Sequence, residues 1–143
     1  MATEIERITI LTYDVDLIEH KCEYEIHNQY DRYNKLDKYE LRLFMKGDSH
    51  EEWFDFKLSP ISETVLKVTD MFIGKSAHRK KGIPEVLIVE SKKIFNKKVV
   101  SSSNKHPILI SERRSDEASK VWKRLEKKGL VRYNEISDVF EVL

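Results

Sequence analysis

A run of four cationic or potentially cationic side chains, HRKK, stands in the middle of the chain at residues 78–81. Gly82 follows the run, and Pro84 stands two residues further on. A basic, glycine-containing loop that enters a helix can hold an anion, because the first N–H groups of a helix lack intrahelical partners and the helix dipole is positive there. These residues therefore predict a site for a phosphate or pyrophosphate, with a solvated basic turn as the alternative.

Few residues are candidates for transferring a proton or orienting a reactant. Asp70 lies among apolar residues of an expected strand, where burial could raise its pKa and make it a base, or it could simply face solvent. Glu90 shares a helical face with apolar residues or marks the edge of that face. Ser102 and Asn104 belong to a polar SSSN stretch that could orient an amine or a water, or could be an ordinary loop. The five histidines are scattered, and no spacing predicts a metal site.

The first half of the chain is predicted to consist mainly of strands. Alternation of apolar residues predicts strands at 5–13, 39–46, 53–58 and 65–73, and the KGDSHE sequence predicts a hairpin loop between the second and third. Residues 15–33 have apolar side chains at both helical and strand spacing. We favour a helix there.

The second half alternates helices and strands. Pro84 suits the first turn of a helix, and apolar spacing extends this helix to about residue 96. A short strand follows at 98–102. Ser115 could cap a second helix that ends at Lys127-Lys128-Gly129, and a closing hairpin follows in residues 130–143. This order predicts an α/β or α+β fold, a mixed, mostly antiparallel sheet with flanking helices.

Composition limits the class of protein. The 143 residues suit one domain over residues 1–143, and 26 Lys+Arg against 25 Asp+Glu give a net charge of +1, which argues against a broad nucleic-acid-coating surface. The single cysteine, Cys22, excludes a disulfide framework and favours a reducing, cytoplasmic location. We see no signal peptide and no membrane-spanning run, and we expect no membrane association.

The stretch Arg79-Lys80-Lys81-Gly82-Ile83-Pro84 resembles the acyl-CoA pyrophosphate loop of the GNAT N-acetyltransferases. That motif is Gln or Arg, two residues, Gly, one residue, then Gly or Ala, so Arg79 and Gly82 match it and Pro84 departs from it. The order of elements and the sequence ASKVWKRLEKKGLVRY near the end are also similar to this family, over roughly residues 65–143. The resemblance implies a GNAT-like fold and acetyl-CoA as co-substrate, with no metal.

The resemblance also implies which residues would bind acetyl-CoA. The pantetheine arm would pair with the backbone of Phe72, Ile73, Gly74 and Lys75. The pyrophosphate would be held by Arg79, Lys80, Lys81, Gly82 and Ile83. An amine of unknown identity, on a protein or a small molecule, would attack the thioester, with Asp70, Ser102 and Asn104 as the candidate catalytic residues.

One catalytic position departs from the family. Many members carry a tyrosine four residues before the glycine of the last turn, as the acid for the departing thiolate. This chain has Leu125 there, with Trp122 nearby, and neither side chain can donate a proton to sulfur in that role. Tyr133 or a water could substitute.

Two other functions remain open. The last helix, with Lys120, Lys123, Arg124 and Lys127, and the hairpin after it resemble the recognition helix and wing of winged-helix DNA-binding domains. We favour nucleic acid less as a partner, because the nearest upstream helix ends near residue 96. The chain could also be a non-catalytic GNAT-like binding protein, and a homodimer is left open.

Overall fold

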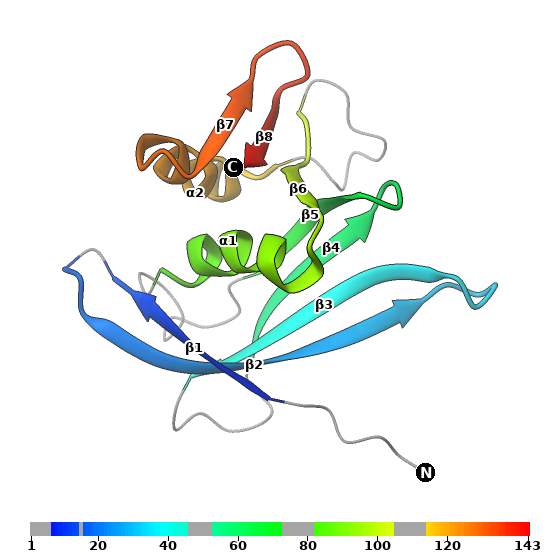
Figure 1. Ribbon diagram of the computed structural model, residues 1–143, viewed down its shortest axis with the longest axis horizontal. Coiled ribbons are helices and arrows are strands. Elements are labelled where there is room, and N and C mark those ends of the chain that lie inside the picture. The colour runs from blue at the N-terminus through cyan, green and yellow to red at the C-terminus, as the bar shows by residue number, and fades with distance from the viewer. Residues whose placement is uncertain (1–6, 15, 46–52, 73–81, 105–113) are drawn as a thin grey trace. The chain divides into compact units, whose positions relative to one another are not determined.

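The computed structural model describes residues 7–14, 16–45, 53–72, 82–104 and 114–143. This part of the chain forms eight strands and two helices (Figure 1). In chain order they are β1 (Ile8–Tyr13), β2 (Glu19–Tyr30), β3 (Leu36–Met45), β4 (Phe54–Pro60), β5 (Val65–Phe72), α1 (Ile83–Phe95), β6 (Lys98–Ser101), α2 (Asp116–Lys127), β7 (Val131–Asn134) and β8 (Val139–Val142). The strands are hydrogen-bonded in the order β1-β2-β3-β4-β5-β6-β8-β7.

The chain divides into two compact units. The predicted single domain over residues 1–143 stays a prediction. The first unit is Met1–Lys57 with Met71–Ile83, and the second is Leu58–Asp70 with Pro84–Leu143. The division passes through β4 and β5, so each of these strands contributes residues to both units.

The first unit is built on antiparallel strands. β1 pairs with β2, with Ile10 opposite Cys22, and β2 pairs with β3, with Tyr24 opposite Leu43. Successive side chains of a strand point to opposite faces, and only one face of these strands near Cys22 and Tyr24 is buried. The strands of this unit contribute the following buried apolar side chains: Ile10, Cys22, Tyr24, Leu41, Leu43, Phe44, Phe54 and Phe56.

The helix favoured for residues 15–33 is wrong, because β2 occupies most of this range. A helix would place Ile18 and Tyr30 on its buried face, but these side chains are 56% and 57% exposed. The strand buries Cys22 and Tyr24 instead, and its backbone pairs with β1 on one side and β3 on the other. Two neighbouring strands thus supply hydrogen bonds and packing that a local pattern cannot reveal.

The second unit contains a parallel strand pair and a closing antiparallel hairpin. Residues Val65 to Val68 of β5 pair in parallel with Lys98 to Ser101 of β6, and α1 lies between the two strands in sequence. β8 pairs antiparallel with β6 and with β7. The predicted elements from residue 65 onward are confirmed to within two residues at each end.

Local signals explain the two helices. Pro84 stands in the first turn of α1, and Asn96 directly after this helix has a left-handed φ of 50°. The Oγ of Ser115 accepts a hydrogen bond from the Ala118 N–H at 3.0 Å, which confirms the predicted N-cap of α2. Gly129 follows α2 with a φ of 76°, as the predicted helix end requires.

The predicted fold class is wrong. Strands account for 49% of the described residues and helices for 23%, and both helices come from the second half of the chain. The prediction was a GNAT-like α/β or α+β layout in which helices flank the sheet. The described part is instead dominated by one mixed sheet, because the segment expected to supply an early helix forms a long strand.

Candidate functional site

The sequence candidates fall into two groups, each following the carboxyl end of a strand. Phe72 is the last residue of β5, and Ser102 to Asn104 directly follow β6. Ile73, Gly74, Lys75, Arg79, Lys80 and Lys81 lie outside the described residues. Gly82 and Ile83 are described, at the start of α1.

The backbone of Gly82 packs closely against the backbone of Tyr13, another residue of the same chain. It has a left-handed φ of 72°, and a Cβ at this position would lie only 2.1 Å from the backbone oxygen of Tyr13. No side chain fits such a gap, so glycine is required for packing against the end of β1. The close packing on Tyr13 is thus a structural reason for glycine at this position, separate from the predicted role of Gly82 in holding a pyrophosphate.

The first turn of α1 contains a carboxylate of its own, and it lacks one N–H donor. Pro84 offers no N–H, and Glu85 places a carboxylate in this turn, where the helix dipole favours it. Nε and Nη2 of Arg124, on α2, lie 2.7 and 2.6 Å from Oε1 of Glu85 and offset its charge. An anion bound here would depend on the basic side chains of residues 79–81 more than on the helix itself.

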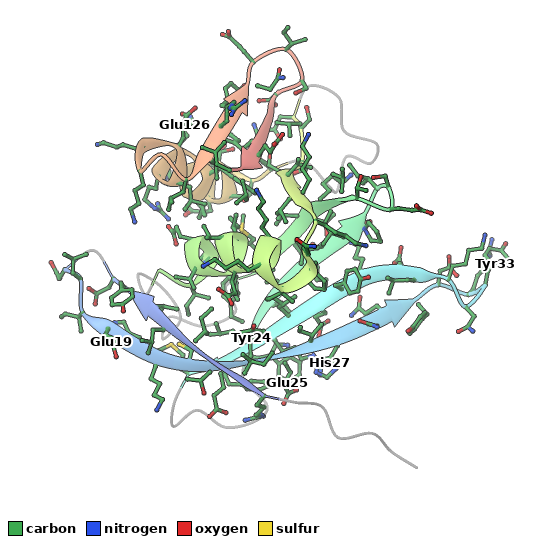
Figure 2. The ribbon with its side chains drawn as sticks, in the orientation of Figure 1. Glu19, Tyr24, Glu25, His27, Tyr33 and Glu126 are labelled. Atoms are coloured by element: carbon green, nitrogen blue, oxygen red, sulfur yellow. The ribbon has the colours of Figure 1, made fainter. Side chains whose placement is uncertain are left out.

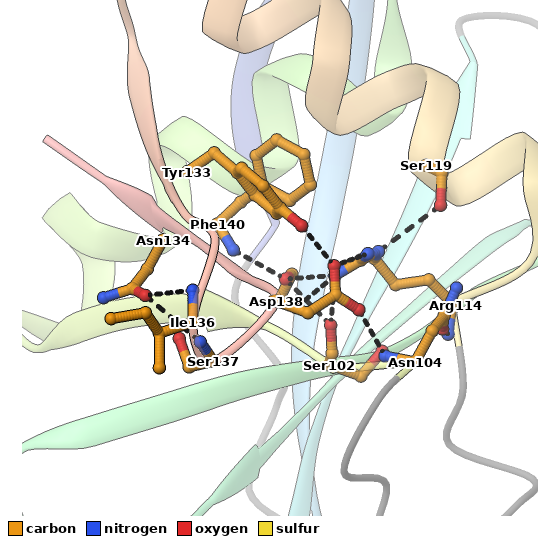
Figure 3. Close-up of polar contacts among 11 residues, drawn as sticks. Ser102, Asn104, Arg114, Ser119, Tyr133, Asn134, Ile136, Ser137, Asp138 and Phe140 are labelled. Atoms are coloured by element: carbon orange, nitrogen blue, oxygen red, sulfur yellow. Dashed lines mark hydrogen bonds and ion pairs between the residues drawn. The ribbon is translucent and has the colours of Figure 1, made fainter.

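The carboxyl end of β6 lies in a buried polar cluster that we call the Arg114 network, formed by Ser101, Ser102, Asn104, Arg114, Tyr133 and Asp138 (Figure 3). The side chains of Arg114 and Asp138 are only 7% and 8% exposed, and Nη2 of the arginine donates to Oδ1 of the aspartate at 2.8 Å. Nη1 of Arg114 also donates to the carbonyl oxygens of Ser102 and Asp138, at 2.6 and 2.7 Å.

Asp138 receives two further hydrogen bonds. The Tyr133 hydroxyl donates to Oδ1 at 2.6 Å, and the Asn104 N–H donates to Oδ2 at 2.8 Å. Burial alone would raise the pKa of Asp138, but the hydrogen bonds from Tyr133, Arg114 and Asn104 outweigh it and hold the pKa well below its usual range. The same bond to Asp138 raises the pKa of Tyr133, so this hydroxyl stays protonated more firmly than a free tyrosine.

The network gives the SSSN stretch a structural role. The Ser101 Oγ accepts from the Phe140 N–H at 2.9 Å, and the Asn104 Oδ1 accepts from the Arg114 N–H at 2.7 Å. These bonds connect the end of β6 to the β7–β8 hairpin, and Asn104 to Arg114, two residues before α2. Of the predicted catalytic residues, Ser102 is 5% exposed and lies in this network together with Asn104.

Arg114 and Asp138 carry the network, and the sequence analysis did not single them out. Asp138 has a φ of 53° in the turn of the hairpin, a conformation that aspartate tolerates better than most residues. That turn chemistry was readable in the sequence. The pairing with an arginine 24 positions away was not, because it depends on how α2 and the hairpin fold back.

Asp70 and Glu90 are both half-buried. The Thr69 hydroxyl donates to Oδ2 of Asp70 at 3.0 Å, so this carboxylate has a polar neighbour on its own strand. Leu87, Ile88 and Ser91 form the buried side of α1, and Glu90 stands beside that side, as expected for the edge of an apolar face.

Two histidine–carboxylate pairs occur in the first unit. Nε2 of His20 lies 3.0 Å from Oδ2 of Asp14, and Nε2 of His27 lies 2.9 Å from Oε1 of Glu25. Glu25 and His27 project from the same side of β2 (Figure 2). Among the described residues, no group of three or more His, Cys, Asp and Glu could hold a metal ion.

The basic residues of α2 lie on its exposed side. Lys120, Lys123 and Lys127 are exposed, whereas Val121, Trp122 and Leu125 are buried. The hairpin after α2 is paired through β8 with β6, with Glu141 opposite Val100. It is therefore part of the sheet.

No protein-family model, curated protein or solved structure matches the chain. Neither α1 nor α2, the two helices in the part that the structure describes, has the length and apolar character needed to cross a membrane.

Proposed function

We propose that the protein binds acetyl-CoA through the segment between β5 and α1 and transfers the acetyl group to an amine. One observation carries this proposal. β5 and β6 are parallel neighbours joined through α1, and the basic run follows β5 and leads into this helix. Ligands of open α/β sheets bind outside the carboxyl ends of the strands, and a basic segment at that position favours an anionic ligand.

The register of the parallel pair adds a second argument. The pairing ends at Val68 opposite Ser101, the last residue of β6, whereas β5 continues to Phe72. The end of β5 thus extends beyond its parallel neighbour, as a strand does when it lends its backbone to an extended ligand. Phe72 and the three residues after it are the proposed contacts of the pantetheine arm.

The remaining roles follow from chemical type. Arg79, Lys80 and Lys81 supply positive charge for the diphosphate, and the N–H groups of Gly82 and Ile83 supply donors. In the transfer step a neutral amine nitrogen attacks the thioester carbonyl, a C–N bond forms, the C–S bond breaks, and the amine loses a proton while the thiolate gains one. Asp70 is the candidate base for the first of these protons.

Binding without catalysis is the second candidate function. It is favoured by the Arg114 network, because Ser101, Asn104 and Tyr133 already hold the β7–β8 hairpin in place. Ser102 contributes its carbonyl oxygen to Arg114. If these groups serve structure alone, the chain binds the nucleotide and leaves the thioester intact. We propose a cytoplasmic location for both the catalytic and the non-catalytic function, because the chain has a single cysteine.

Titration calorimetry with acetyl-CoA tests the binding step. We expect the triple variant Arg79→Glu, Lys80→Glu, Lys81→Glu to weaken binding at least about tenfold, since charge-assisted hydrogen bonds to phosphate are lost. The matched control is Lys120→Glu, Lys123→Glu, Lys127→Glu, which makes the same change in charge on α2 and should bind acetyl-CoA as the wild type does. Equal loss in both triple variants, or no binding by the wild type, would overturn the proposal.

An assay of thiol release with a panel of amines separates the two versions of the function. Asp70→Asn should lower kcat with little change in acetyl-CoA affinity if Asp70 is the base. Binding without turnover of any amine favours the non-catalytic version. Salt-sensitive binding of duplex DNA that the α2 triple variant abolishes would instead support the DNA-binding interpretation.

A further inference from the structure

The turn between β2 and β3 presents two aromatic side chains to solvent. Tyr30 ends β2 and is 57% exposed, and Tyr33, at the end of this hairpin (Figure 2), is 68% exposed. The guanidinium of Arg32 lies 4.9 Å from the centre of the Tyr33 ring. Apolar residues that are exposed singly need no explanation, but here two rings and a planar cation occur within four consecutive residues. We call residues 30–35 the tyrosine turn.

Asp31 holds this turn in a defined shape. Its Oδ1 accepts hydrogen bonds from the N–H groups of Tyr33 and Lys35, at 2.8 and 3.0 Å. Its own N–H donates to the Lys35 carbonyl at 2.8 Å, and its carbonyl accepts from the Asn34 N–H at 3.0 Å. Asn34 has a left-handed φ of 61°, which asparagine tolerates. The rings are therefore carried on an ordered backbone, which reduces the entropy lost when they bind a ligand.

The tyrosine turn has a small excess of positive charge. Arg32 and Lys35 are exposed, and among the described residues no carboxylate pairs with either side chain. Asp31 is the acid of this turn, and its Oδ1 is engaged by the backbone. Asp37 and Lys38, near the start of β3, add one charge of each sign. The turn thus offers two cations beside two aromatic rings.

These groups match the chemistry of a nucleotide chain with unpaired bases. A base of any identity can stack on an aromatic ring or on a guanidinium plane, because every base has a π face. Arginine and lysine contact the phosphates between the bases. The turn has no aliphatic side chain to insert into a membrane. Its two cations favour a ligand with phosphates over a neutral polysaccharide.

We propose that the tyrosine turn binds single-stranded RNA. Tyr30 and Tyr33 would each stack against one unpaired base, and Arg32 and Lys35 would contact the adjoining phosphates. RNA fits better than DNA, because RNA loops, bulges and ends carry unstacked bases, whereas the bases of duplex DNA are paired and stacked. The contact is local, so it is compatible with the net charge of +1 of the whole chain. This inference does not depend on the proposed acetyl transfer.

Fluorescence anisotropy with a labelled, unstructured oligouridine RNA of about ten nucleotides tests the inference. Stacking of two bases and contacts with two phosphates predict a dissociation constant of about 10–100 μM at low salt. Tyr33→Ala should weaken binding at least about fivefold, and Tyr30→Ala with Tyr33→Ala should abolish it. Both side chains are exposed, so thermal stability should stay the same. A wild type that does not bind this RNA at about 1 mM protein overturns the inference.

Matched comparisons separate stacking from charge. Tyr33→Phe keeps the ring and should bind the RNA as the wild type does. Lys35→Gln removes one phosphate contact and should reduce the slope of log K against log salt by about 0.7. An oligomer of the same length without bases should bind at least about fivefold more weakly than the RNA. Equal affinities for the two oligomers, or equal RNA binding by the wild type and Tyr33→Ala, would show that the rings take no part.

Other ligands and one other variant test the assignment to RNA and to this turn. Duplex DNA should compete poorly, because its bases are stacked inside the helix. Equal competition by duplex DNA, tighter binding of single-stranded DNA than of RNA, or binding of a neutral polysaccharide in place of RNA would each overturn the assignment. Loss of RNA binding in the Arg79→Glu, Lys80→Glu, Lys81→Glu variant but not in the tyrosine variants would place the RNA at the segment between β5 and α1 instead.

Discussion

Two clusters of arginine and carboxylate groups, one in each unit, behave differently. In the Arg114 network both charged side chains are less than a tenth exposed, at 7% and 8%. In the first unit, Nε of Arg7 donates to Oε2 of Glu25 at 2.8 Å, but these side chains are 30% and 15% exposed. Both clusters pair an arginine with a carboxylate. They differ in how far the two side chains are buried and in which segments of the chain they join.

Connectivity matters as much as burial. Asp138 ties together Asn104 after β6, Arg114 two residues before α2 and the β7–β8 hairpin, and only β6 and β8 among these segments also pair through their backbones. Glu25 joins β2 to the start of β1, and the backbones of these strands already pair. Removing Asp138 therefore leaves the hairpin without its side-chain link to Arg114 and leaves the Arg114 charge without its partner. Removing the second leaves the backbone pairing intact.

The largest expected effect comes from Asp138→Asn. Asparagine keeps the shape and tolerates the φ of 53°, so the change isolates the loss of charge. It leaves Arg114 buried without its counterion, which typically costs about 3–5 kcal/mol of unfolding free energy. Urea denaturation followed by circular dichroism measures this loss.

A second variant checks the explanation. Combining Asp138→Asn with Arg114→Met removes both charges and should recover part of the lost stability, because a buried ion pair can often be replaced by apolar groups at little cost. A loss below about 1 kcal/mol for Asp138→Asn alone would mean that the network behaves like a surface pair.

The Arg114 network should affect the pH dependence of stability at both acidic and basic pH. The pKa of Asp138 is lowered in the folded state, so its contribution is present above the unfolded value near 3.9 and is lost as pH falls below it. The pKa of Tyr133 is raised, so its contribution is present below about pH 10 and is lost as pH rises further. In urea titrations across pH, Asp138→Asn should flatten the acidic limb relative to the wild type. Parallel curves between about pH 2 and 5 would contradict this assignment.

Glycines in the two units give the next comparison. Gly82 and Gly129 have left-handed φ values of 72° and 76°, but only Gly82 would place a Cβ against backbone, at 2.1 Å from the Tyr13 oxygen. Gly82→Ala should cost about 2–4 kcal/mol, from strain and a forced backbone shift. Gly129→Ala, with nothing within 4 Å, should cost only the strain of about 1–2 kcal/mol. Equal losses in chemical denaturation would show that the contact with Tyr13 is unimportant.

The same contrast explains what the sequence could predict. The helix ends in the second unit depend on local signals, and Pro84, Ser115 and Gly129 each stand where their chemistry requires. The first unit depends on pairing between strands, so the apolar spacing around Cys22 fitted a helix and a strand equally well. Likewise, the sequence predicted a short strand at 98–102, and Ser102 and Asn104 lie just after β6. Their engagement by Arg114 could not be predicted, since it arises only from the folded arrangement.

The smallest expected effect is that of Arg7→Gln in the exposed cluster. The hydrogen bonds from His27 and Arg7 lower the pKa of Glu25 against the effect of burial. The guanidinium of Arg7 also lies 4.3 Å from the centre of the Phe44 ring. Arg7→Gln removes an exposed ion pair and one cation–π contact. We therefore expect the free energy of unfolding, measured by urea denaturation, to fall by about 0.5–1 kcal/mol. Arg7→Lys retains the charge without the planar group, so a similar loss in both variants would assign the effect to stacking. A loss as large as that of Asp138→Asn would mean that exposure does not distinguish the two clusters, and that β1 depends on Arg7 for its place beside β2.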